Sequence, residues 1–426
     1  MLEENNRDAS WAKCEALRHE INILIEKEEI YWKQRSCISW LCEGDRNTKF
    51  FHAKASTRKK NLIVSLKEMD GTMIKLQSNI ERVIIQHFST LFQSSNPNAI
   101  EEVVAHIPRV VTKEMNDWLM RDFHPEEVRF SLFHMHPSKA PSLDGMTAFF
   151  FQKFWHIVGA DVTNAVLSCL NSGIILRNIN NTHIALIPKT KDPKLIIQYH
   201  PISLCNVLYK IISKMLVNRL KLILPNLISD TQSPFILGRL ITDNILVAYE
   251  TLHSMKKKRW GKIGQVAIKL DMSKTYDRVE WGYLKRVMEK MGFHAKWVQL
   301  IMACITTAHF SVLVNGKPTG YILPSKGLRQ GDPLSPYLFL FCAEGLTMLL
   351  RKAETDGIIK GVVASRGGPC ISHLLFADDS LLFCRASVEE CQQVISLLNL
   401  YEDASGQKVN TDKTSLFFSS NIGFET

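Results

Sequence analysis

The sequence has none of the cysteine pairs that mark zinc sites or disulfide frameworks. Its ten cysteines are scattered singly, and no two of them are spaced as Cys-x-x-Cys. A chain of 426 residues can bury a core without disulfide bonds to hold it together. We therefore expect reduced, mostly buried thiols in a reducing compartment.

Hydrophobic runs long enough to cross a bilayer are also lacking. The longest apolar run, Tyr337–Leu350, is interrupted by Glu344 and is too short to span a membrane. The first ten residues, MLEENNRDAS, are polar and do not resemble a signal peptide. These absences predict a protein of the cytoplasm and/or the nucleus that has no membrane partner.

The charge balance points toward an anionic partner. Lysine and arginine number 52 against 42 acidic residues, which gives a net charge of +10 and a pI near 9.0. Such an excess suits a polyanion such as nucleic acid, although many basic proteins bind none. Charge alone therefore does not decide the function.

The first 120 residues are predicted to be a mostly helical extension. Apolar positions at helical spacing indicate an amphipathic helix between residues 10 and 35. Residues 43–66 are basic and aromatic, and they could bind a phosphate backbone or form a solvated turn. Prolines between residues 96 and 145 indicate short helices and loops, with a boundary near 120–125. We expect two domains, residues 1–120 and 121–426, the second with a core at about 170–426.

Helices and strands alternate in this second domain. Helices are predicted within residues 146–180, 204–224, 281–291 and 297–305, and from Ser335-Pro336 onward. Asp277 and Glu280 have the spacing of a capping box for the helix that contains Trp281. Apolar strands are predicted at 184–187 and 266–270, and around a hairpin turn at Asn315-Gly316.

An acidic turn is the most informative feature of the sequence. Two apolar strands in Ile371–Cys384 flank the adjacent residues Asp378 and Asp379. Hairpin turns favour Asn-Gly or Asp-Gly, whereas two neighbouring carboxylates repel by roughly 4 kcal/mol at an effective dielectric near 20. Asp271 ends another apolar strand. Three aspartates from two strand ends could hold two Mg²⁺ ions for an in-line displacement at phosphorus, although any one of them alone would be an ordinary turn residue.

Several segments resemble the motifs of reverse transcriptases, in the correct order. FADD at 376–379, LDMSKTYDRVEW at 270–281, GLRQGDPLSPYLF at 327–339 and SGQKVNTDK at 405–413 are similar to motifs C, A, B and D of LINE-type (non-LTR) retrotransposon enzymes. Upstream segments resemble those of plant elements and lie at 43–52, 139–145, 186–193, 201–221 and 238–250. The resemblance covers about residues 30–420.

The resemblance implies an α+β right-hand polymerase fold. An antiparallel palm sheet would pack on helices beside mixed fingers. The implied activity is that of an RNA-directed DNA polymerase that adds dNTPs to a primer 3′-hydroxyl. Its partners would be an RNA template, a DNA primer and dNTPs, and its cofactor would be two Mg²⁺ ions, with Mn²⁺ as an alternative.

The resemblance also implies roles for individual residues. Asp271 and Asp378 would be metal ligands together with the carbonyl of Met272, and Asp379 would complete the acidic cluster. Tyr276 stands where the family has an aromatic steric gate that selects deoxynucleotides. The remaining substrate contacts would be Gln330 and Gly331 at the nascent base pair, Lys189 and Arg239 on phosphates, and Lys413 at the leaving pyrophosphate.

The sequence departs from the family pattern at several positions. His200 stands where arginine is usual, and Thr275 replaces an alanine beside the gate. The chain ends soon after motif D, so we expect it to be truncated and to lack the family's thumb and endonuclease. One alternative function is therefore an inactive remnant that at most binds nucleic acid. A group II intron maturase is a further alternative, which Phe376 and the motif A string disfavour.

Overall fold

The computed structural model describes residues 13, 15–28, 62–68, 70–365, 367–377 and 379–422. The chain divides into two compact units, residues 1–66 and 67–426. In the first unit, residues 15–28 are helical, as predicted for the amphipathic segment. Residues 43–61 of the basic aromatic stretch lie outside the described residues. The division falls at residue 66, whereas the sequence predicted a boundary near 120–125.

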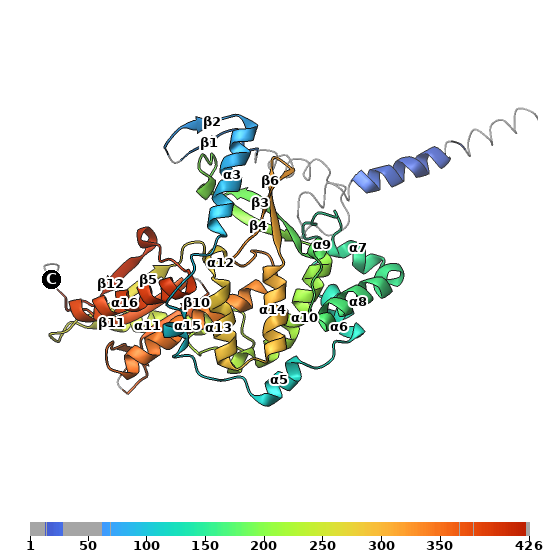
Figure 1. Cartoon of the computed structure of the whole chain (residues 1–426). Coiled ribbons are helices and arrows are strands. Elements are labelled where there is room, and N and C mark those ends of the chain that lie inside the picture. The colour runs from blue at the N-terminus through green and yellow to red at the C-terminus, as the bar shows by residue number, and fades with distance from the viewer. Residues whose placement is uncertain are drawn as a thin grey trace, which may run out of the picture. The chain divides into compact units, whose positions relative to one another are not determined.

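Residues 67–120 belong to the same compact unit as the motifs (Figure 1). After the short strands β1 (Leu66–Lys67) and β2 (Met73–Ile74), the chain forms α3 (Gln77–Leu91), α4 (Ile100–Val104) and α5 (Lys113–Leu119). Helix α4 packs against α13 (Trp281–Met291) and α16 (Val388–Ser405), and Val103 and Val104 are fully buried. This segment is therefore part of the core.

Four strands form the sheet that contains Asp271 and Asp379, which we call the acidic sheet. Its order is β10 (His373–Phe376), β11 (Asp379–Arg385), β5 (Gln265–Asp271) and β12 (Ser415–Phe418), and all neighbours are antiparallel. Strand β5 ends at Asp271, as the apolar pattern predicted. An antiparallel sheet packed on helices was the predicted architecture.

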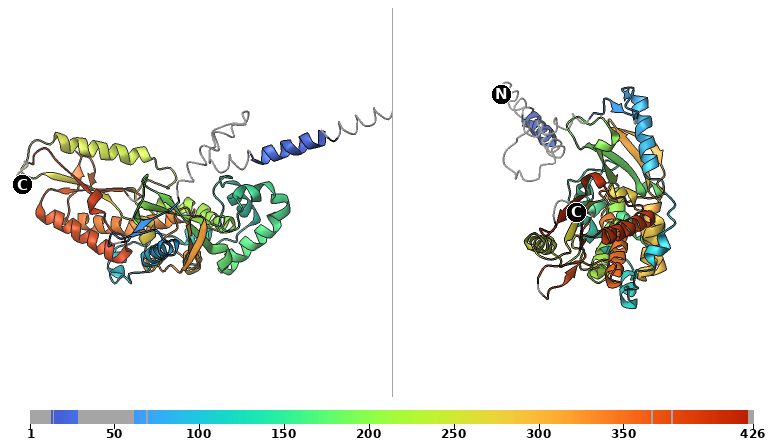
Figure 2. Two further views of the ribbon diagram at one scale, coloured as in Figure 1. Left: turned by 90° about the horizontal axis from the view of Figure 1, so that it is seen from above. Right: turned by 90° about the vertical axis from the view of Figure 1, so that its left-hand side faces the viewer.

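Helices cover both faces of the acidic sheet. Because side chains alternate along each strand, neighbouring residues pack against different helices. Val266 and Leu270 join the main core, to which α15 (Ser335–Thr355) and α16 contribute. Ala267 and Phe383 point to the other face and pack with Met255 of α11 (Ile241–Lys257). Figure 2 shows α11 on one side of the strands and α16 on the other.

A second sheet, which we call the mixed sheet, has the order β4 (Tyr199–Cys205), β3 (Asn181–Pro188), β6 (His309–Val314) and β7 (Lys317–Ile322). Strands β3 and β6 are parallel and the other two pairs are antiparallel. The turn between β6 and β7 is at Asn315-Gly316, where both residues have positive φ, as the hairpin prediction requires.

The helices follow the predicted apolar periodicity. Helix α10 (Val207–Ile223) fills the segment predicted at 204–224 and continues as a short 3₁₀ turn through Pro225. The other helices of this unit are α6 (Pro125–Phe133), α7 (Ala148–Lys153), α8 (Trp155–Ser172), α9 (Arg177–Asn180), α12 (Thr275–Arg278) and α14 (Ala295–Thr306). Short strands β8 (Val362–Val363) and β9 (Cys370–Ile371) pair with each other.

The predicted capping box at α13 is wrong. The helix begins at Trp281, directly after Glu280, and Asp277 belongs to the preceding helix α12. Glu280 is buried and accepts hydrogen bonds from the hydroxyls of Ser94 (2.6 Å) and Ser95 (2.9 Å). Its spacing to Asp277 matches that of a capping box, but its carboxylate binds two serines that are distant in the sequence.

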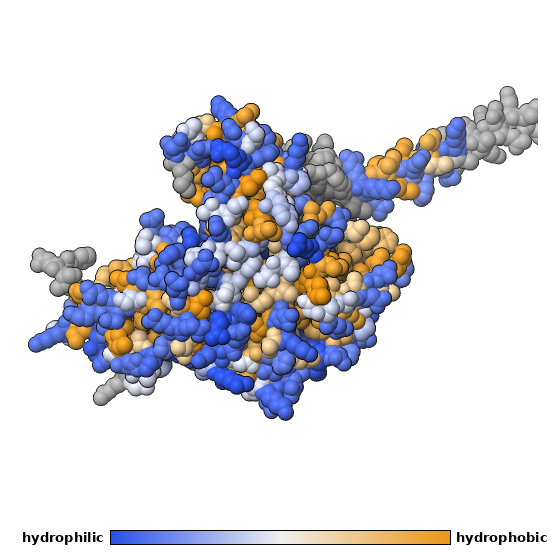
Figure 3. Space-filling model, viewed as in Figure 1, coloured by the Kyte–Doolittle hydropathy of each residue, from blue (hydrophilic) through white to orange (hydrophobic). Residues whose placement is uncertain are grey.

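Within the described residues, none of the helices combines the length and apolar character needed to cross a membrane. On the face shown in Figure 3, hydrophobic side chains are interspersed among hydrophilic ones.

Candidate active site

Two of the three predicted aspartates face each other across neighbouring strands. Asp271, the last residue of β5, is the register partner of Asp379, the first residue of β11. Directly opposite residues project to the same face of a sheet, with Cβ atoms about 4.5–5.5 Å apart. Asp378 lies outside the described residues. The fold therefore brings together carboxylates that are more than 100 positions apart in the sequence.

The turn that leads to Asp379 is held by residues that the sequence did not single out. Ala377 has a positive φ of 53°, and its N–H donates to the side-chain oxygen of Gln232 (3.0 Å). Asn244 of α11 donates to the carbonyl of Leu375 (3.2 Å). Because Gln232 and Asn244 are ordinary polar residues by composition, no local pattern marks them as supports of the turn.

Motif D lies beside Asp271. Asn410 donates from its backbone N–H to the Asp271 carbonyl (2.8 Å) and from its amide to the carboxylate (3.1 Å). The ammonium of Lys413 is 3.3 Å from the same carboxylate. Since the Lys413 side chain is 67% exposed, this pair adds little stability. It does place a cation at the acidic site.

The donor atoms at this site suit a divalent cation. Asp271 and Asp379 offer carboxylate oxygens, and the carbonyl of Met272 follows directly. That carbonyl accepts a hydrogen bond from the Thr275 hydroxyl (3.2 Å), which leaves its second lone pair available. Oxygen ligands are those that Mg²⁺ prefers. No group of three or more His, Cys, Asp or Glu side chains suited to a metal is found among the described residues, which exclude Asp378.

Tyr276 connects the acidic strand to motif B. It follows Lys274, which has a left-handed conformation (φ 52°), and its ring centroid is 5.6 Å from that of Phe339 in α15. Its carbonyl accepts from the N–H of Leu328 (2.7 Å). The half-buried ring of this motif A residue thus packs against motif B at the start of α15, and its role as a gate stays a prediction.

Motif B approaches the mixed sheet through glycines. Gly331 has a φ of 106°, and a Cβ there would lie 3.1 Å from the Ser203 carbonyl of β4. The neighbouring Gln330 carbonyl accepts from the Ser203 N–H (2.9 Å). At Gly327 a Cβ would lie 2.9 Å from the Asp277 carbonyl. Glycine is needed at both positions because the backbones approach so closely.

The two predicted phosphate contacts differ in their surroundings. Lys189 is exposed after β3, and its ammonium donates to the Ile197 carbonyl (3.3 Å). The guanidinium of Arg239 instead donates to backbone carbonyls that form the turn after α10, those of Pro225, Ile228, Ser229 and Gln232. Arg239 therefore supports the segment that contacts the acidic turn, and its predicted phosphate contact stays a prediction.

His200 is the register partner of Ile187, at the end of β3 that leads to Lys189. Burial and the nearby Lys189 lower the pKa of His200 below its ordinary value. The imidazole is therefore neutral at pH 7, unlike the arginine usual in the family.

Asp277 lies in a buried cluster of titratable groups. The ammonium of Lys274 is 3.0 Å from Nε2 of His87. Burial raises the pKa of Asp277 to about 7, although Lys274, Lys189 and Arg278 all act to lower it. Burial and Lys274 lower the pKa of His87 to about 4.

The folded protein is expected to lose stability through Asp277 as pH rises. The folded-state pKa of Asp277 exceeds its unfolded value of about 3.8. Between those two pH values the folded protein binds a proton that the unfolded chain does not, so the free energy of unfolding decreases as the pH rises and that proton is lost. The lowered pKa of His87 makes stability rise with pH instead. Wild type is therefore compared with a variant that lacks only the Asp277 carboxylate. Between pH 5 and pH 8, wild type should lose up to about 3 kcal/mol more unfolding free energy than Asp277→Asn. Urea unfolding at pH 5, 6.5 and 8 tests this, and parallel profiles would contradict it.

The antiparallel acidic sheet packs on helices in the same compact unit as the mixed sheet, which agrees with the predicted α+β class. The family model described as reverse transcriptase (RNA-dependent DNA polymerase) matches residues 187–424, more than half of the chain. The chain therefore belongs to the reverse transcriptase family.

Its relatives agree with the motifs. The chain is 30% identical over 391 residues to a protein of transposon TX1 from Xenopus laevis, which covers 89% of this chain and 29% of the relative. It is 26% identical over 281 residues to the Pol polyprotein of the R2DM retrotransposable element of Drosophila melanogaster, covering 65% of this chain and 24% of that protein. A stretch of 74 residues is 54% identical to an uncharacterised mitochondrial protein of Arabidopsis thaliana and covers 17% of this chain and 61% of that protein. The predicted resemblance to LINE-type reverse transcriptases is confirmed, and the chain spans less than a third of either transposon relative.

Proposed function

We propose that this chain forms the polymerase core of a non-LTR retrotransposon reverse transcriptase, which adds dNTPs to a primer 3′-hydroxyl along an RNA template. The observation that carries the proposal is the pairing of Asp271 with Asp379 at one end of the acidic sheet. Tyr276 and the glycine-rich start of motif B lie beside the same end. The site thus combines acidic groups, an aromatic ring and a close backbone approach.

Reverse transcriptases as a family use divalent metal ions. Here Asp271, Asp378 and the Met272 carbonyl would hold them, and Asp379 would complete the acidic cluster. Two bound Mg²⁺ ions would supply positive charge at the attacking and leaving oxygens. The chain's own part is to hold its carboxylates at a fixed strand register. Lys413 lies next to Asp271, and we infer that it screens the charge of the leaving pyrophosphate.

Incorporation of dTTP on a poly(rA)–oligo(dT) hybrid with Mg²⁺ tests the proposal. Incorporation that stops when EDTA is added supports a metal-dependent polymerase core. A folded chain that binds the hybrid without extending the primer would contradict the proposal and would favour a remnant that only binds nucleic acid.

Replacing Tyr276 with valine is expected to weaken the exclusion of ribonucleotides. The Tyr276 ring packs against Phe339, and in this position it would clash with the 2′-hydroxyl of a ribonucleotide. Valine removes the ring and with it this steric barrier. The preference for dTTP over UTP should fall about tenfold or more, because steric discrimination at one contact has this magnitude. Single-nucleotide incorporation with each nucleotide measures the ratio.

The matched control for this prediction is Tyr276→Phe. It keeps the ring, so it should keep the preference for deoxynucleotides. An unchanged ratio in the valine variant would rule out the gate.

A further inference from the structure

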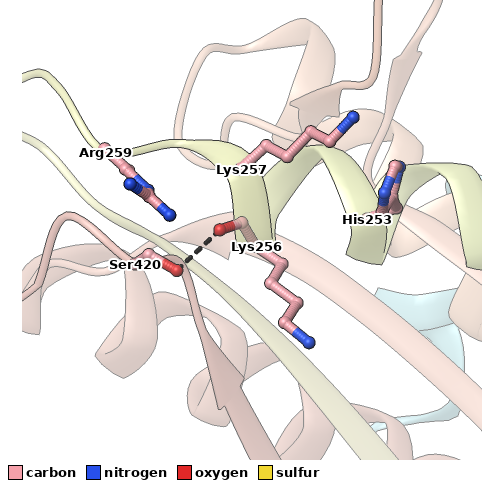
Figure 4. A pocket seen from close by; sticks show the side chains of 5 residues that line it. All are labelled: His253, Lys256, Lys257, Arg259 and Ser420. Atoms are coloured by element: carbon pink, nitrogen blue, oxygen red, sulfur yellow. Dashed lines mark hydrogen bonds between the residues drawn. The ribbon is translucent and has the colours of Figure 1, made fainter.

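Positive charge gathers at the end of the acidic sheet that is remote from the aspartates. We call the residues there the basic corner: His253, Lys256, Lys257, Lys258 and Arg259, which end α11 and begin the next turn. They border a hollow of about 800 Å³ lined by His253, Lys256, Lys257, Arg259 and Ser420 (Figure 4).

The basic corner is distinct from the catalytic site. Strand β5 runs from Gln265, next to the corner, to Asp271, and Gln265 pairs with Arg385 of β11. Six steps along a strand at about 3.3 Å each separate the two ends by roughly 20 Å. A ligand at the corner therefore does not compete directly for the aspartates.

Within the described residues, none of the four lysine and arginine side chains of the corner forms an ion pair. The carboxyl end of α11 offers about half a negative charge, which offsets only part of this cluster. Burial lowers the pKa of Lys258, and the positive charge of Arg385 adds to this effect. An anion would relieve this repulsion.

The turn that follows is held in a fixed conformation. Ser420 donates to the Lys256 carbonyl (2.7 Å), as Figure 4 shows, and Asn421 donates to the carbonyls of Gly261 (2.9 Å) and Ile263 (3.2 Å). This turn presents Trp260, which is 89% exposed. A large indole left in water beside lysines favours stacking on a flat ligand.

A second exposed aromatic ring, Tyr249, lies on α11 one helical turn before His253. Tyr249 is 63% exposed, and its ring is stacked with that of His253 at 5.9 Å between centroids. The corner therefore combines cations with exposed rings. Proteins that bind single-stranded nucleic acid use this combination, since a duplex hides the faces of its bases.

We propose that the basic corner is a second site for single-stranded nucleic acid. Lys256, Lys257 and Arg259 contact its phosphates, and an unpaired base stacks on Trp260. The site is independent of polymerase chemistry, so an Asp271→Asn variant keeps it.

A solvated loop and a nuclear import signal are two other interpretations of the run Lys256–Arg259, and the backbone disfavours the second. Such a signal binds its receptor as an extended segment, whereas α11 is helical through Lys257. The N–H of Lys258 continues the helical bonding to Ser254 (3.1 Å) and Met255 (3.2 Å). Presenting this run in extended form would require the last helical turn to unwind.

Binding of fluorescent 12-nucleotide oligo(U), oligo(dT) and a duplex, measured by anisotropy, tests the proposal. The double variant K256E/K257E should weaken binding of the single strands about tenfold or more and flatten its salt dependence. The matched control K290E/K296E reverses two exposed lysines of α13 and α14 and should change binding less than twofold. Trp260→Ala should weaken the single strands about fivefold or more and leave the duplex unchanged. Tighter binding of oligo(U) assigns the site to RNA, and the reverse assigns it to DNA.

Crosslinking locates the site. A 4-thiouridine oligonucleotide should crosslink to the peptide that contains Trp260, in wild type and in Asp271→Asn alike. Equal weakening by both charge variants would overturn the proposal, as would the absence of any Trp260 effect. Normal oligonucleotide binding by K256E/K257E, combined with loss of nuclear accumulation, would assign the run to import instead.

Discussion

Replacing Asp271 with asparagine is expected to reduce dTTP incorporation on a poly(rA)–oligo(dT) hybrid by about a thousandfold or more. Asparagine keeps the shape of the side chain but loses the negative charge that a hard cation requires. Losses of this size are usual when an essential member of a catalytic group is removed. Asp379→Asn is expected to behave in the same way, because it is the register partner on β11.

The fold should tolerate the Asp271 change. The Asp271 side chain is 27% exposed, and the amide of Asn410 can donate to an asparagine oxygen as it does to the carboxylate (3.1 Å). Asp161→Asn is the matched control, since this exposed aspartate is far from the site in sequence and lies on helix α8 rather than on the acidic sheet. Circular dichroism should not distinguish the three proteins. Full activity in Asp271→Asn would remove the acidic pair from the reaction.

The sequence predicted an acidic cluster because Asp271 and the Asp378-Asp379 turn adjoin apolar strands. It did not predict the strand register, and the pairing of Asp271 with Asp379 across β5 and β11 comes from the structure. The hairpin at Asn315-Gly316 was predicted for a similar reason, because these two residues alone favour the positive φ angles that the turn requires. Features whose cause is local in sequence were therefore predicted well.

The supports of the site were not predictable in the same way. Glu280 matches a capping box by spacing, yet its partners Ser94 and Ser95 are about 185 positions away. Gln232 and Asn244 hold the acidic hairpin through single hydrogen bonds to its backbone. Such contacts depend on which elements meet in three dimensions, and one sequence contains no periodic signal for them.

Arg329 shows how much stability depends on contacts of this kind. Its side chain and that of Asp332 are 3% and 1% exposed, and they form an ion pair at 3.1 Å. The guanidinium also donates to the Cys304 carbonyl (2.9 Å) and stacks on Tyr209 (3.9 Å), whose hydroxyl donates to Asp332 (2.6 Å). This network joins motif B to α9, α10 and α14.

Replacing Arg329 with leucine is expected to lower the free energy of unfolding by about 3–5 kcal/mol, because it leaves Asp332 buried without its cation. The double variant R329L/D332N should recover part of this loss, since it removes both charges. Arg286→Leu is the matched control: Arg286 also pairs with two carboxylates, but it is 44% exposed and its loss should cost less than about 1 kcal/mol. Urea unfolding followed by circular dichroism measures all three. A loss below about 1 kcal/mol for Arg329→Leu would contradict the argument that motif B is anchored through this pair, whereas recovery in the double variant would show that the cost lies in the unpaired carboxylate.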